Sequence, residues 1–549
     1  MSRRFALLSF ALVAACSSAP RPQTTPTPAP VQTPAPVAAP TPAPAVPLFE
    51  APRDWQLLDE SADRVPGISA RRAERELLAG RAPRRTVVVA VIDGGVDTAH
   101  TDLRGVLWMN PKETPGNHVD DDHDGYVDDV RGWNFIGGPG GDVDHESLEV
   151  TRIHARCLKR PAGGDGPMPS AAECASAARE YQKELESATE QTTFIRDLRT
   201  SLDPAMARLR VSLGDSVTVE RIRTLQPTDA TTRAAQQYVL RVAEQVAPPD
   251  AIAQADTANT NKLRYSLNLD YNARSVVGDH PGDVTERRYG NADVTGPDAL
   301  HGTHVAGIIG AMRNGIGIDG IATNVRIMSV RTVPDGDERD KDVANAIRYA
   351  VDAGANVINM SFGKSRSPQK AAVDEAVKYA DAHGVLMVHA AGNDGANLAD
   401  SPNFPTPAYL GGGRPTNWIE VGASSWQGGS KLAAPFSNYG QTQVDVFAPG
   451  VDLLSTVQGG GYERESGTSM AAPVVTGLAA VLMSYFPDLS AADVKRIIME
   501  SAVKHADQRV VKPGSESEMV PFGTLSVTGG VVNEFEAVKM AQQMARPTP

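Results

Sequence analysis

The chain has 549 residues, of which 41% are apolar and 22% are charged, and this is enough apolar sequence for a large buried core. The composition excludes a chain that is disordered throughout. With 66 acidic and 53 basic residues the formal net charge is −13, so the average surface repels a nucleic-acid backbone and no nucleic-acid partner is expected.

The first residues have the pattern of an export signal. Arg3 and Arg4 precede an apolar run over residues 5–15, which is too short to cross a bilayer as a helix. The run resembles a bacterial lipoprotein signal, in which residues 1–15 are removed and Cys16 becomes the lipid-carrying N-terminus. We therefore expect an exported lipoprotein, held on a membrane through Cys16 and facing the periplasm or the cell surface. An ordinary signal peptide cut nearby is the alternative.

Residues 16–47 are nearly all Pro, Ala, Thr and Val beyond the first few positions. Such a segment has too few large apolar side chains to build a core. In polyproline II geometry it forms a stalk of roughly 90 Å, enough to hold a domain away from a membrane.

The first strong strand covers residues 86–92, a continuous β-branched run of the kind buried on both faces of a parallel sheet. It ends at Asp93, where a carboxylate is placed at the carboxyl edge of the sheet. In open α/β sheets, sites form at that edge. Taken alone, Asp93 is more simply explained as a turn residue.

Two later segments predict buried helices that begin with polar residues. Residues 299–311 are small and apolar after His301, which is placed at the helix entry, whereas His304 faces inward as a packing residue. Residues 465–482 contain Ser469 at the start of a second apolar helix. A serine at that position is ordinarily a helix cap.

Taken together, the three segments resemble the subtilisin-like serine peptidases. The motifs are Asp-Gly after a strand, His-Gly-Thr-His-Val-Ala-Gly, and Gly-Thr-Ser-Met-Ala-Ala-Pro, and they occur in the Asp, His, Ser order of subtilisin. The resemblance covers residues 86–137 and 293–535. It implies an α/β fold of three layers, with a mainly parallel central sheet flanked by helices. It also implies a catalytic triad of Asp93, His301 and Ser469.

The same resemblance extends to the substrate cleft. Ser361, Phe362 and Gly363 match the strand that pairs with an extended peptide, and Asn393 matches the donor to the oxyanion. Phe362 flanks the expected first pocket, and residues 403–405 are expected at its base.

The implied function is a serine endopeptidase that acts on proteins or peptides through an acyl-enzyme and needs no cofactor for its chemistry. Two other functions stay open, a catalytically silent peptide-binding protein and a partner-docking module built on an insertion.

Residues 120–129 form an acidic loop that needs a counter-charge. Asp120, Asp122 and Asp124, followed by Gly125, match the first half of a calcium-binding loop, and Asp128 falls at its ninth position. The twelfth position is Arg131, so no EF-hand is expected. We expect structural Ca²⁺ here, with a solvated acidic turn as the alternative.

Asp93 and His301 are 208 positions apart, which indicates an insertion between two parts of the catalytic domain. The expected boundaries are residues 48–145 and 284–540 for the two parts, 146–283 for a helical insertion, and 541–549 for a tail. An apolar stripe from Tyr181 to Leu202 predicts a long amphipathic helix whose stripe packs in a core, and residues 231–246 predict another helix. No feature indicates an oligomeric state.

Cys157 and Cys174 both lie in the insertion. With Cys16 committed to lipid, an exported compartment permits a disulfide between the other two cysteines. Two free thiols are the alternative.

Overall fold

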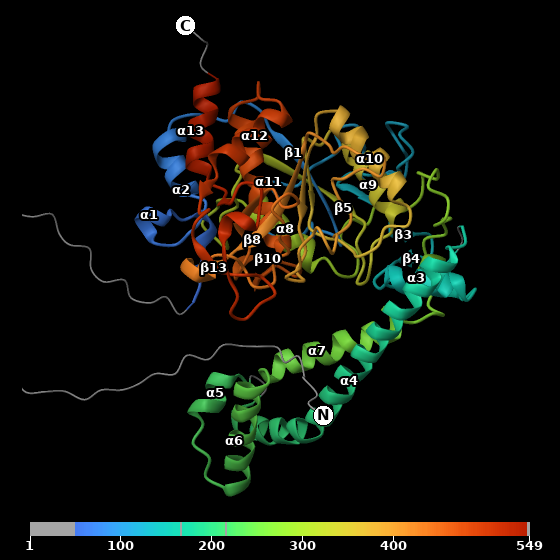
Figure 1. The fold of residues 1–549 in the computed structure, drawn as a ribbon, viewed down its shortest axis with the longest axis vertical. Coiled ribbons are helices and arrows are strands. Elements are labelled where there is room, and N and C mark those ends of the chain that lie inside the picture. Colours follow the sequence, from blue (N-terminus) through green and yellow to red (C-terminus); the bar gives the residue numbers. More distant parts are fainter. Residues whose placement is uncertain (1–49, 165–166, 215–216, 546–549) are drawn as a thin grey trace, which may run out of the picture. The chain divides into compact units, whose positions relative to one another are not determined.

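The computed structural model describes residues 50–164, 167–214 and 217–545, and these residues fall into two compact units (Figure 1). The smaller unit contains residues 193–257. The larger contains residues 50–192 and the chain from residue 258 onward. The larger unit therefore contains both ends of the insertion, residues 146–192 and 258–283, together with the central sheet.

The larger unit is built on a nine-stranded sheet with the order β12-β15-β9-β8-β7-β6-β1-β5-β2. All neighbouring strands are parallel except β12 and β15, which are antiparallel. The strands are β1 (Val87–Asp93), β2 (Gly132–Asn134), β5 (Val325–Arg331), β6 (Val357–Met360), β7 (Leu386–Ala390), β8 (Trp418–Ser424), β9 (Val446–Pro449), β12 (Val503–Lys504) and β15 (Gly530–Val531). This is the mainly parallel α/β sheet that the sequence predicted.

Helices cover both faces of this sheet (Figure 1). Alternate residues of β1 enter different cores: Val89 and Val91 pack with helices α8 and α11 to α13, whereas Ala90 and Ile92 pack with α9 and α10. The β-branched run is therefore buried on both sides, as expected for a central parallel strand. The flanking helices are α8 (Leu300–Gly310), α9 (Asp340–Asp352), α10 (Lys370–Ala382), α11 (Thr468–Tyr485), α12 (Ala491–Ser501) and α13 (Glu534–Met544).

Helix α11 lies at the centre of the core. Among the described helices it is the one that is long and apolar enough to span a membrane, and 89% of that apolar window is buried in the protein. Its composition is accounted for by packing against the sheet. Short elements complete the unit: helices α1 (Glu60–Asp63) and α2 (Ala70–Ala73), and the ladders β3 (Gly137–Gly138) with β4 (Gly141–Asp142), β10 (Leu453–Val457) with β11 (Gly461–Glu465), and β13 (Arg509–Val511) with β14 (Met519–Pro521).

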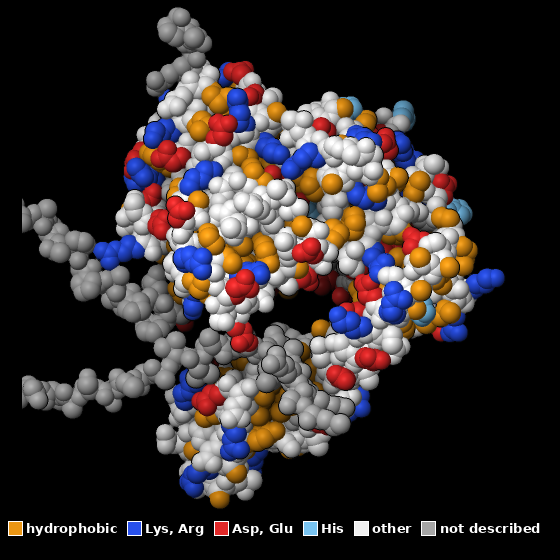
Figure 2. Space-filling view, viewed as in Figure 1, with side chains coloured by type: hydrophobic (Ala, Val, Ile, Leu, Met, Phe, Trp, Pro, Cys, Tyr) orange, Lys and Arg blue, Asp and Glu red, His pale blue; other side chains and the backbone are white. Residues whose placement is uncertain are grey.

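The insertion is helical, with α3 (Glu149–Cys157), α4 (Ala171–Leu213), α5 (Val219–Thr224), α6 (Ala230–Gln245) and α7 (Pro249–Asn261). The apolar stripe of α4 is buried in two separate cores. Tyr181 and Ala188 pack with α3 in the larger unit, and Ile195 and Leu202 pack with α5 to α7 in the smaller one. Figure 2 shows acidic and basic side chains interspersed over one face of the molecule.

Candidate active site

A cleft of about 520 Å³ lies at the carboxyl edge of the central sheet. Asp93 ends β1, Ser361 directly follows β6, and Asn393 follows β7 by three residues. The first turns of α8 and α11 add His301 and Ser469 to the same lining. Parallel strands deliver their carboxyl ends to one edge, so residues far apart in sequence meet there.

Asp93 and His301 form a close hydrogen-bonded pair. Nδ1 of His301 lies 2.8 Å from Oδ1 and 3.1 Å from Oδ2 of Asp93. The Asp93 side chain is 3% exposed and that of His301 is 44% exposed. Desolvation lowers the pKa of His301, but the Asp93 carboxylate, with smaller contributions from Glu465 and Asp298, more than offsets this, so the pKa lies above its usual value. The contact orients the ring and engages Nδ1, as required of a catalytic imidazole.

The glycine after His301 allows α8 to approach β1 closely. A Cβ at Gly302 would lie 2.1 Å from the carbonyl oxygen of Gly95 and 3.1 Å from Cβ of Asp93. A larger residue would therefore push the start of α8 away from the strand end. The His-Gly motif thus has a packing reason as well as a chemical one.

Ser469 lies in the first turn of α11, and its hydroxyl faces the end of β6. Its Oγ donates to the carbonyl oxygen of Ser361 at 3.0 Å, and Oγ of Ser361 donates to the carbonyl oxygen of Ser469 at 2.8 Å. Within the described residues no hydrogen bond joins Ser469 to His301, although both line the cleft. Ser469 thus lines the same cleft as His301, and its hydroxyl proton is directed at the carbonyl oxygen of Ser361.

The Asn393 amide is oriented by Thr468. Its Oδ1 accepts hydrogen bonds from the backbone N–H of Thr468 at 2.8 Å and from the Thr468 hydroxyl at 3.0 Å. Because the amide oxygen is engaged there, the NH₂ group is the end left to serve as a donor in the cleft. Its neighbour on the chain, Gly392, adopts a φ of 99°, which glycine takes without strain.

Ser361, Phe362 and Gly363 line the cleft beside Asn403. The Asn403 amide donates to the carbonyl oxygen of Ala390 at 3.1 Å, and a Cβ at Gly363 would lie only 2.3 Å from the Asn403 side chain. Asn403 therefore closes the space between the segments that follow β6 and β7. The peptide bond between Phe404 and Pro405 is cis.

One wall of the cleft was not foreseen from the sequence. Residues 333–336 and Glu338, which follow β5, line it together with Asp144 from the loop before α3. Burial raises the pKa of Glu338 to about 7, with Lys364 opposing the rise and Asp337 contributing to it. Residues 333–336 could have been expected here, because they follow β5, which is parallel and adjacent to β1, and sites form at the carboxyl ends of such strands.

The acidic loop brings some of the expected ligands together. Asp120 and Asp122 join Glu113, with one oxygen of each within 4.8 Å of the others. The amide of Asp124 donates to Asp120 and Asp122, whereas the Asp128 carboxylate accepts from two backbone N–H groups elsewhere in the loop.

Glu113 has the features of a ligand that the sequence pattern omitted. Its side chain is only 7% exposed, and Oε2 is buried without a hydrogen-bond partner. Three carboxylates with one oxygen of each close together, one of the three residues also carrying a buried oxygen without a hydrogen-bond partner, fit a hard cation such as Ca²⁺. Glu113 lies seven positions before Asp120, so no D-x-D spacing could have revealed it.

The two cysteines of the insertion form a disulfide between the end of α3 and the first turn of α4, with Cα atoms 5.9 Å apart. The lipidation candidate, Cys16, and the linker after it lie outside the described residues.

Comparison with known proteins places the chain in a family. The model of the subtilase family (Peptidase_S8) matches residues 84–519, well over half of the chain. The "Thermophilic serine proteinase" of Bacillus sp. (strain AK1) is 47% identical over 186 residues, which are 34% of this chain and 42% of that protein. Subtilisin DY of Bacillus licheniformis is 35% identical over 208 residues, 38% of this chain and 72% of that protein.

A solved protease structure from Pseudoalteromonas arctica PAMC 21717 is 28% identical, covers 46% of this chain and 78% of its own, and has a TM-score of 0.38. The chain spans less than half the length of the thermophilic relative. On the strength of the family match and the subtilisin relative, the chain belongs to the subtilase family of serine peptidases.

Proposed function

We propose that the chain is a serine endopeptidase that hydrolyses peptide bonds of proteins through Asp93, His301 and Ser469 and an acyl-enzyme intermediate. The observation that carries the proposal is the 2.8 Å contact between Asp93 and His301 in a cleft that also holds Ser469. A serine hydroxyl is a weak nucleophile at neutral pH and needs an oriented base beside it.

In this mechanism the Ser469 hydroxyl rotates from Ser361 toward the imidazole and gives its proton to Nε2 of His301 as Oγ attacks the peptide carbonyl. Asp93 stabilises the imidazolium that results. The oxyanion receives hydrogen bonds from the Asn393 NH₂ and from the Ser469 backbone N–H at the start of α11. His301 then protonates the leaving amine, and water hydrolyses the acyl-enzyme by the same steps.

A fluorophosphonate probe tests this assignment because it reacts only with an activated serine. We expect the folded wild-type protein to be labelled, Ser469→Ala to abolish labelling, and the matched Ser466→Ala variant to be labelled as the wild type. Absence of labelling in folded wild-type protein would contradict the peptidase proposal and favour a silent peptide-binding protein.

We further propose that the protein is exported and tethered to a membrane by a lipid on Cys16. The support is the short apolar run that ends at Cys16 and the Pro-rich stalk that follows. Cys16→Ser is expected to abolish incorporation of labelled palmitate and to move the protein from the membrane to the soluble fraction. Unchanged labelling would remove the proposal.

We propose Ca²⁺ as a structural ion held by Glu113, Asp120 and Asp122. The unpartnered, buried Glu113 Oε2 supports it, because a carboxylate left in that position without a counter-charge is destabilising. The ion would neutralise the acidic loop and takes no part in the hydrolysis.

A further inference from the structure

The start of the insertion is tied to the substrate cleft by buried charged side chains. We call the set formed by Glu146, Glu149, Arg152, Arg339 and Lys364 the stem network. All five side chains are buried. The first three come from the start of the insertion, whereas Arg339 and Lys364 belong to the catalytic body, and all five lie in the larger unit.

Lys364 connects this network to the proposed peptide-binding residues. It directly follows Gly363, and its backbone exchanges two hydrogen bonds with Phe404, of 3.0 Å and 2.8 Å. Its Nζ lies 3.0 Å from Glu149 Oε2, 2.9 Å from Asp340 Oδ1 and 2.7 Å from the carbonyl oxygen of Glu338. The end of the peptide-binding segment is therefore anchored by a lysine whose charge is partly neutralised by α3.

Arg152 contacts the loop after β5, which lines the cleft. Its guanidinium lies 2.5 Å from Glu149 Oε2 and donates to the carbonyl oxygens of Asp337 at 2.8 Å and Glu338 at 3.1 Å. Arg339 next to them donates to Glu146 at 2.8 Å. Arg152 thus binds both the cleft-lining loop after β5 and the Glu149 carboxylate that pairs with Lys364.

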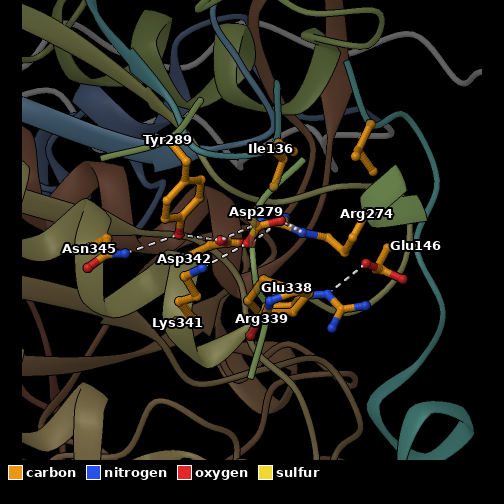
Figure 3. Close-up of polar contacts among 12 residues, drawn as sticks. Ile136, Glu146, Arg274, Asp279, Tyr289, Glu338, Arg339, Lys341, Asp342 and Asn345 are labelled. Carbon is orange, nitrogen blue, oxygen red and sulfur yellow. Dashed lines mark hydrogen bonds and ion pairs between the residues drawn. The ribbon is translucent and has the colours of Figure 1, made fainter. Parts of the chain in front are cut away.

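The end of the insertion contacts the start of α9, which directly follows the same loop (Figure 3). Arg274 pairs with Asp342 at 2.8 Å, and Lys341 pairs with Asp279 at 2.9 Å, at the start of α9. Both ends of the insertion are therefore joined to the segment 337–342 by side chains that are nearly or fully buried. Buried pairs of this kind hold a particular geometry, because a displaced partner leaves an uncompensated charge.

We propose that Glu149 and Arg152 are positioning residues that set the geometry of the substrate cleft through Lys364 and the loop at residues 337–339. The start of the insertion, residues 146–152, is then part of the structure that shapes the substrate-binding cleft. This proposal rests on the proposed peptidase function, and neither residue touches the reacting atoms.

The test separates peptide binding from activation of Ser469. Casein is digested with the wild-type protein, and an octapeptide spanning one cleavage site serves as the extended substrate. For Arg152→Met we expect KM for this peptide to rise about tenfold or more, since small displacements of positioning groups are costly. The rate of fluorophosphonate labelling, which needs an activated Ser469 but no extended peptide in the cleft, is expected to stay within about twofold. Arg152→Lys keeps the positive charge but not the several N–H donors of the planar guanidinium, so its KM is expected to rise less than that of Arg152→Met.

Arg160→Met is the matched control, because Arg160 also pairs with a carboxylate of the insertion, that of Asp270, but both side chains are about half exposed. It should change neither readout. If Arg152→Met does not fold, as judged by circular dichroism, Arg152→Lys and Glu149→Gln carry the test. An unchanged KM for the octapeptide in folded variants would overturn the proposal. So would a fall in the labelling rate as large as the fall in kcat/KM for the octapeptide.

Binding without turnover keeps the two proposals distinguishable. In a Ser469→Ala background, fluorescence anisotropy of a labelled casein peptide reports on the cleft alone. Weaker binding by about tenfold on adding Arg152→Met supports the positioning role even if wild-type protein shows no labelling. Equal binding overturns it while leaving the peptidase proposal intact.

Discussion

The replacement Glu534→Gln is expected to remove a large pH dependence from the stability of the larger unit. Glu534 is the first residue of α13, is 0% exposed, and has both carboxylate oxygens buried without a hydrogen-bond partner. Burial, with a smaller contribution from the nearby Glu74, raises the pKa of this carboxyl from 4.5 to about 8, although Arg313 opposes the rise. The folded protein therefore favours the protonated acid.

The sign and the size follow from linkage. Because the folded pKa lies above the unfolded one, the stability that this group contributes is fully present below about pH 4.5 and is lost as the pH rises to about 8. The difference between the two pKa values corresponds to about 5 kcal/mol lost above pH 8, and to about 3 kcal/mol at pH 7. Glutamine resembles the protonated acid and cannot ionise, so the variant escapes this loss.

Urea unfolding at pH 5, 7 and 8.5 measures the effect, in a Ser469→Ala background that prevents self-digestion. The advantage of Glu534→Gln over its parent should grow by about 3 to 4 kcal/mol between pH 5 and pH 8.5. Glu500→Gln, at an exposed position of α12, is the control and should run parallel to the parent. A constant difference between Glu534→Gln and the parent at all three pH values would refute the reasoning.

Three further outcomes are expected. Asn393→Ala should lower kcat by about 10²- to 10³-fold with little change in KM, and an unchanged kcat would exclude its oxyanion role. The acid limb of the activity profile should lie above pH 6.5, because only neutral His301 accepts the serine proton and Asp93 raises its pKa; a limb below that value would contradict the pairing. A chelator should lower the melting temperature, added Ca²⁺ should restore it, and Asp122→Asn should weaken the response; an identical melting curve with and without chelator would count against the ion.

Much of the fold and of the candidate site could be predicted because the informative patterns are local. The β-branched run before Asp93 predicts a doubly buried strand, and the structure places it at the centre of the parallel sheet. The small residues around His301 and Ser469 predict buried helices, and α8 and α11 are those helices. The roles of these residues in catalysis stay predictions, which the labelling experiment addresses.

Other features depend on residues that no local pattern connects. Glu113 approaches Asp120 through a loop, and the single apolar stripe of α4 divides between two cores that each need other helices. In the sequence, nothing distinguishes Arg152, Glu149 and Lys364 from other charged residues, and charged side chains are normally expected at the surface.

The sequence by itself determined the order of the triad candidates and one doubly buried strand, because these patterns need only neighbouring residues. Through the resemblance of its motifs it also implied the family and the mainly parallel α/β sheet. Only the tertiary structure decided that the insertion's stem is joined to the cleft. Arg152 and Glu149 lie about two hundred positions before Lys364, and folding brings them into contact with Lys364 and with residues 337 and 338. The pairing of buried charges is a property of three-dimensional contact, because each charge is tolerated inside only by the partner that folding brings to it.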